Sequence, residues 1–86
     1  MMNNLRMPRW IDILLAIYKS PEQHRYCERL NRSVGCSLTY FRNTVVLMAK
    51  HNLLEIQEGR KIKTLRLTER GHQMASSILA IKSLLP

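Results

Sequence analysis

The sequence is poor in acidic residues, in glycine and in cysteine. It holds six Asp and Glu against 14 Lys and Arg, with only three Gly and two Cys among its 86 residues. No glycine-rich loop that could cradle a phosphate is visible, nor a cluster of nucleophile, base and orienting residue. Cys27 and Cys36 fit neither a zinc-ligand set nor a disulfide framework. No apolar run reaches the roughly 18 residues needed to span a membrane. These absences argue against an enzyme, a metalloprotein and a membrane protein.

Positive charge is what the sequence has in excess. The formal net charge is +8. So strong a positive field on a small body predicts a polyanionic partner, with nucleic acid expected first and an anionic membrane surface second. The remaining alternative is that the charge only keeps the protein soluble. Aromatic residues make up 6% of the chain, which is few for stacking on RNA bases. Double-stranded DNA is therefore the expected partner.

The length of the chain predicts a single domain over 1–86. A hydrophobic content of 45% is ordinary for a globular domain. A body this small leaves little room for an enzyme cleft. His24, His51 and His72 are scattered without carboxylate partners, so neither a metal nor another cofactor is expected. The two cysteines are expected to be small buried side chains in a cytoplasmic protein with reduced thiols. A disulfide between them stays open, and a redox switch is the lesser alternative.

Hydrophobic periodicity predicts a mainly α fold with a small β-hairpin (α+β). Pro8 suits the first turn of a helix, Ser37 and Thr68 suit helix N-caps, and Gly35 and Asn52 suit helix ends. In order, the sequence predicts a flexible arm at 1–7, helices at 8–19, 22–33 and 37–51, a hairpin at 54–67 and a last helix at 68–85. Ile62 breaks the alternation of the hairpin, which indicates a twist or bulge near its tip.

Two stretches carry a resemblance to a known family. The segment CERLNRSVGCSLTYFRNTVVLMAKHNLL, at 27–54, and the RLTERG that follows the basic hairpin, at 66–71, resemble the winged helix-turn-helix of MarR-, PadR- and ArsR-like regulators. The chain is also similar to short winged-helix proteins of archaea and their viruses. Asn31 stands where the family usually has Ala, and Leu47 where it often has a charged residue. The resemblance implies a DNA-binding transcriptional regulator whose third helix, at 37–51, is the recognition helix.

The resemblance places the start of that helix in the major groove. Arg42 is then expected to contact guanine and Asn43 adenine, because their side chains match those base edges. The full set of expected DNA contacts is Arg32, Ser37, Thr39, Tyr40, Arg42, Asn43, Arg60, Lys61 and Lys63. Alternatives stay open: Ser37 or Thr39 as caps only, Tyr40 half-packed against the body, Arg42 as a solvated charge, and the hairpin cations as protection of a sheet edge. The hairpin itself is expected along the backbone or in the minor groove.

The first and last helices carry more apolar surface than a small core absorbs, and this predicts a homodimer. The residues expected at or near its interface are Trp10, Leu14, Met74, Ile78, Ile81 and Leu85, with the monomer core as the alternative for each. Two other functions stay open: a sequence-tolerant architectural DNA-binding protein, and a winged helix used only for protein contacts.

Overall fold

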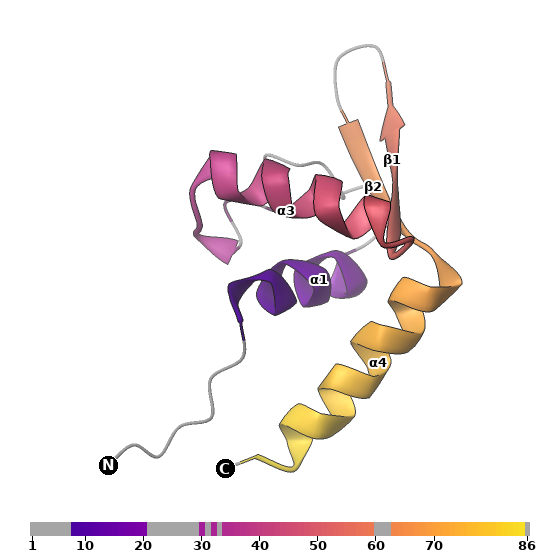
Figure 1. The fold of residues 1–86 in the computed structure, drawn as a ribbon. Helices are drawn as coiled ribbons and strands as arrows, with labels where there is room; N and C mark the ends of the chain where they lie inside the picture. Colours follow the sequence, from indigo (N-terminus) through magenta and orange to yellow (C-terminus); the bar gives the residue numbers. More distant parts are fainter. Residues whose placement is uncertain (1–7, 21–29, 31, 33, 60–62, 86) are drawn as a thin grey trace.

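A computed structural model describes residues 8–20, 30, 32, 34–59 and 63–85. Within them the order is α1 (Arg9–Lys19), α3 (Leu38–Lys50), β1 (Leu54–Glu58), β2 (Lys63–Leu67) and α4 (Glu69–Ser83) (Figure 1). The described part of the chain thus has three helices and an antiparallel hairpin, not the four helices expected. Most of the predicted helix at 22–33 lies outside it, although Leu30 and Arg32 have helical backbone. The predicted arm at 1–7 and the bulge at Ile62 also lie outside it.

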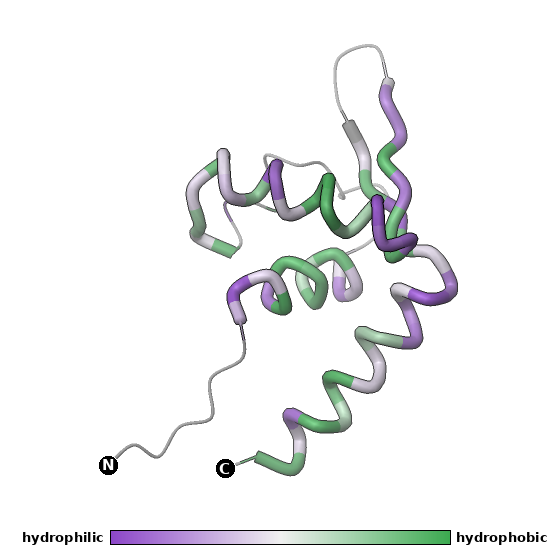
Figure 2. Tube along the Cα trace, viewed as in Figure 1, coloured by the Kyte–Doolittle hydropathy of each residue, from purple (hydrophilic) through white to green (hydrophobic). Residues whose placement is uncertain are grey.

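The core forms around α1, which is apolar over most of its length (Figure 2). A helix that is apolar on most sides must be covered on most sides. α3, β2 and α4 all contact α1, and Ile13, Leu14 and Ile17 are completely buried. Burying each such side chain contributes about 1.5–3 kcal/mol. Leu14 therefore belongs to the core of the single chain. It has no surface left for the subunit contact expected of it.

α3 packs on this core through one face. Phe41, Val45 and Met48 are spaced i, i+4 and i+7, and all three are buried. Side chains at this spacing lie on one side of a helix. Ser37 is the N-cap, because its hydroxyl oxygen accepts a hydrogen bond of 3.1 Å from the backbone N–H of Tyr40. Because Phe41, Val45 and Met48 hold one face of α3 against the core, the opposite face of the helix is exposed to solvent.

The end of α3 is a Schellman motif. Asn52 has a φ of 61°, the left-handed conformation that Asn tolerates better than most residues. The N–H groups of Asn52 and Leu53 donate to the carbonyl oxygens of Ala49 and Met48, at 3.0 and 2.9 Å. The chain turns here, so β1 starts two residues after Asn52 and remains in contact with α3.

Thr68 ties the start of α4 to that same turn. Its hydroxyl donates to the carbonyl oxygen of Asn52 at 2.7 Å and accepts from the N–H of Gly71 at 3.1 Å. Thr68 is therefore the N-cap of α4, as the sequence predicted. Its own N–H donates to the carbonyl oxygen of Leu53 at 3.0 Å. Gly71 is buried against Leu53, and a Cβ there would clash with the Leu53 carbonyl oxygen. One junction thus sets the directions of α3, the hairpin and α4.

The hairpin projects from this junction, and α4 leaves it on the other side (Figure 1). β1 and β2 pair with Leu54 opposite Leu67 and Ile56 opposite Leu65. Leu54, Leu65 and Leu67 are buried, as alternation of inward and outward side chains requires. The strands thus join the core at their base, and their outer ends extend beyond it.

Candidate nucleic-acid interface

A stripe of exposed side chains runs along α3 on the side away from the core. Its members are Thr39, Asn43, Val46 and Lys50, spaced i, i+4, i+7 and i+11, and all four are exposed. We call this set the α3 stripe. With the opposite face of α3 packed against the core, the α3 stripe is the part of the helix that a groove of DNA could receive.

Arg42 lies beside the α3 stripe, one turn of helix before Val46, and is exposed. Ser37 is exposed too, but its oxygen already caps α3. Tyr40 is 38% exposed and points toward a pocket on the flank of α3. The structure therefore brings Thr39, Arg42 and Asn43 together on the outward side and turns Tyr40 toward the body.

Two members of the α3 stripe are absent from the contacts expected from sequence. Val46 and Lys50 lie on the same face as Thr39 and Asn43, yet the expectation stopped at the first turns of the helix. Extending the spacing from Asn43 by three and then four residues would have found both. Lys50 adds an exposed cation at the far end of the stripe.

The other expected contacts are only partly described. Arg32 is exposed, with helical backbone, just before the turn that leads to α3. Lys63 opens β2 opposite Glu58, so its backbone is placed at the outer end of the hairpin. Arg60 and Lys61 lie outside the described residues.

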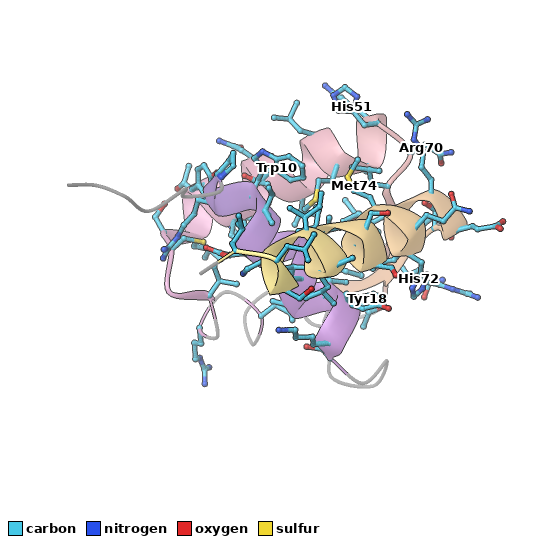
Figure 3. All side chains as sticks on the ribbon, turned by 90° about the horizontal axis from the view of Figure 1, so that it is seen from below. Trp10, Tyr18, His51, Arg70, His72 and Met74 are labelled. Carbon is cyan, nitrogen blue, oxygen red and sulfur yellow. The ribbon has the colours of Figure 1, made fainter. Side chains whose placement is uncertain are left out.

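A largely apolar pocket of about 440 Å³ lies between α1, α3 and the start of α4. Figure 3 shows Trp10, His51, Arg70 and Met74 on the side where these helices meet. The residues that line it are Trp10, Tyr40, Thr44, Leu47, Met48, His51, Leu53, Arg70 and Met74. Leu47, one of these residues, is 55% exposed. This apolar surface stays open to solvent in the single chain.

The residues expected at a subunit interface divide into two groups. Trp10 and Met74 line the pocket, Ile81 is 51% exposed, and Leu85 is partly buried. Leu14 and Ile78 are buried in the core, with 0% and 9% exposure. Leu84, which was not expected at an interface, is 84% exposed. The surface that a second subunit could reach is therefore the pocket together with the outer end of α4.

The described part of the chain holds neither a cluster of metal ligands nor a membrane-spanning helix. No three His, Cys, Asp or Glu side chains gather there as a metal ion requires. None of the helices described is both long and apolar enough to cross a membrane.

Two solved structures share this arrangement. AF1382 from Archaeoglobus fulgidus superposes with a TM-score of 0.82 at 21% identity, over 88% of this chain and 86% of that one. F-93 of the virus SSV1 superposes with a TM-score of 0.74 at 19% identity, over 95% and 94%. Both are small winged-helix proteins. This chain has a winged-helix fold. The β1–β2 hairpin is its wing, and α3 occupies the place of the helix that the sequence resemblance named as the recognition helix.

The sequence itself matches no protein-family profile and no curated protein. At identities near 20%, the two structures establish the fold alone.

Proposed function

We propose that this protein binds double-stranded DNA as a transcriptional regulator, with α3 in the major groove. The observation that carries the proposal is the α3 stripe, which faces directly away from the core with Arg42 beside it. An exposed helix is what the major groove admits, and amide and guanidinium groups match the edges of adenine and guanine. The net charge of +8 supplies attraction to phosphate.

The wing is the second contact in this proposal. Lys63 starts β2 at the outer end of the hairpin, and Arg60 and Lys61 precede it in the sequence. Three cations within four residues of the sequence, ending at the start of β2, favour contact with the phosphate backbone or the minor groove. Such contacts add affinity for any sequence, whereas Arg42 and Asn43 supply the preference among sequences.

A salt titration on a mixed pool of duplex DNA tests the proposal. If a bound dimer neutralises about six to ten phosphates, affinity falls roughly 10³- to 10⁵-fold between 50 and 200 mM salt. Arg60→Ala/Lys61→Ala should weaken binding to all sequences. Arg42→Ala should cost about 1–3 kcal/mol and flatten the preference among them. Lys19→Ala, an exposed cation at the end of α1, is the matched control that should change little.

The results separate the candidate functions. No duplex binding at low salt would remove the DNA proposal and favour a protein-interaction module. Binding with a steep salt slope but no sequence preference, unchanged by Arg42→Ala, would mean an architectural DNA-binding protein.

We also propose that the protein acts as a homodimer built on the pocket. The chain carries both an open apolar pocket and exposed apolar side chains on α4, Ile81 and Leu84. A subunit that carries both an apolar pocket and exposed apolar side chains can pair with a second copy about a two-fold axis, each copy offering both parts. Two copies of α3 could then enter successive major grooves about one helical turn apart.

Light scattering coupled to size exclusion tests the dimer. Leu47→Asp and Ile81→Asp should each convert it to monomer, because each places a carboxylate in an apolar contact. Ser76→Asp, which adds the same charge at an exposed position of α4 on another side of the helix from Ile81, should leave the mass unchanged. Trp10 is the only tryptophan and lines the pocket, so its fluorescence should shift as wild type dissociates on dilution. A monomeric wild type at high concentration would contradict the proposal.

A further inference from the structure

Val46 is an apolar side chain in the middle of a polar, cationic surface. It is 46% exposed and belongs to the α3 stripe, opposite the buried face of the helix. At an exposed helix position, a β-branched residue such as Val is also a weaker helix former than Ala, Glu, Lys or Gln. Neither core packing nor helix propensity therefore accounts for it. Leu47 differs, because it lines the pocket.

The neighbours of Val46 on the helix surface indicate the kind of binding partner that it contacts. Arg42 and Lys50 lie one turn before and one turn after it, at i−4 and i+4, and both are exposed. A partner that fits this surface needs an apolar group to meet Val46 and negative charge on both sides of it to meet Arg42 and Lys50. The major groove of DNA has this character, because phosphates border it and the C5-methyl group of thymine projects into it.

Asn43 makes the match more specific. It lies three residues before Val46 on the α3 stripe, so the two side chains are neighbours on the helix surface. The amide of Asn pairs with N6 and N7 of adenine, and adenine and the thymine methyl belong to the same base pair. An amide beside an isopropyl group therefore complements neighbouring A·T pairs.

We propose that Val46 reads the methyl group of thymine, so that the DNA recognised by α3 contains A·T pairs in the major groove beneath Asn43 and Val46. This inference rests on the proposed DNA binding, and it names which chemical feature of DNA the α3 stripe selects. It predicts a response to removal of a single methyl group that leaves every hydrogen-bonding group of the base intact.

Uracil in place of thymine removes that methyl group. Duplexes that wild type selects from a random pool are resynthesised with uracil, and affinities for the two forms are compared. Burial of one methyl group is worth about 0.8 kcal/mol, or about fourfold in affinity, so wild type should bind the uracil form about fourfold more weakly for each methyl contacted. Val46→Ala should bind both forms alike. Ser76→Ala, at an exposed position of α4 outside the α3 stripe and the pocket, should keep the wild-type ratio.

The outcomes separate this inference from the proposed function. Failure of wild type to bind thymine duplexes would overturn both. Equal affinity for the thymine and uracil forms would overturn the reading of thymine and leave DNA binding standing. A uracil penalty that persists in Val46→Ala would show that the methyl group acts through DNA shape or another residue, and would also overturn the role of Val46. Circular dichroism of the variant, altered only at an exposed site, confirms that it is folded.

Discussion

Gly71→Ala sets two opposite effects against each other. Gly71 lies in the first turn of α4, where Ala is the better helix former by about 1 kcal/mol. Propensity alone therefore predicts a more stable protein. The structure predicts the reverse, because the added methyl group would clash with the carbonyl oxygen of Leu53. That oxygen belongs to backbone and accepts the N–H of Thr68, so it cannot turn aside as a flexible side chain could.

The size of the loss follows from what must move. Crowding of a packed site costs about 1–3 kcal/mol. Relief requires α4 to withdraw from Leu53, which strains the two hydrogen bonds of Thr68 to Leu53 and Asn52, each worth about 0.5–1.5 kcal/mol. After the gain in propensity is subtracted, we expect a net loss of about 3 kcal/mol. For a domain of this size that lowers Tm by roughly 12–24 °C.

Thermal and urea denaturation followed by circular dichroism measure this loss, at one protein concentration for all variants, because association raises the apparent stability. Ser76→Ala is the control. It changes an exposed position in the same helix and should gain a few tenths of a kcal/mol from propensity. If Gly71→Ala proves as stable as wild type or more so, the inferred clash between its methyl group and the carbonyl oxygen of Leu53 is refuted.

Three smaller predictions concern hydrogen bonds and backbone conformation around the same fold. Thr68→Val keeps the side-chain shape but loses the cap on Gly71 and the bond to Asn52, so urea denaturation should show a loss of about 1–3 kcal/mol. Asn52→Ala forces a methyl-bearing residue to a φ of 61° and should lose about 1 kcal/mol, while Asn52→Gly should lose nothing. Arg9→Gln breaks an exposed 3.0 Å bond from the guanidinium to the carbonyl oxygen of Val34 and should change stability by less than about 0.5 kcal/mol.

Local signals in the sequence predicted the helix ends well. Ser37 and Thr68 are the N-caps, and Asn52 has the left-handed conformation expected of it. Each of these depends on a side chain and the backbone within a few residues of it, so it can be predicted without knowledge of the fold. The hydrogen bond from Thr68 to Asn52, 16 residues away, left no comparable signal, because it exists only once α3 and the hairpin are in place.

The last helix shows where periodicity fails. Met74, Ile78 and Ile81 are spaced i, i+4 and i+7 and were expected together at a subunit interface, but Ile78 is buried while Ile81 is 51% exposed. The spacing gives a face of the helix, but not where along its length the neighbouring elements end. Because Gly71 brings the first turn of α4 close to Leu53, the first half of α4 packs on the core and the second half extends past it. Residues at the same helical spacing therefore lie in two different environments, one buried and one exposed.

α3 takes part in three surfaces, and their separation makes the proposed roles distinguishable. Its buried face packs against the core, the α3 stripe faces outward, and a flank with Tyr40 and Leu47 lines the pocket. A substitution on one sector need not disturb the others. Leu47→Asp should therefore remove dimerisation while a single copy keeps its preference for thymine over uracil, and Val46→Ala should remove that preference while the protein remains a dimer. If either substitution abolished both properties, the pocket and the α3 stripe would be one functional surface, and DNA recognition would depend on the second subunit.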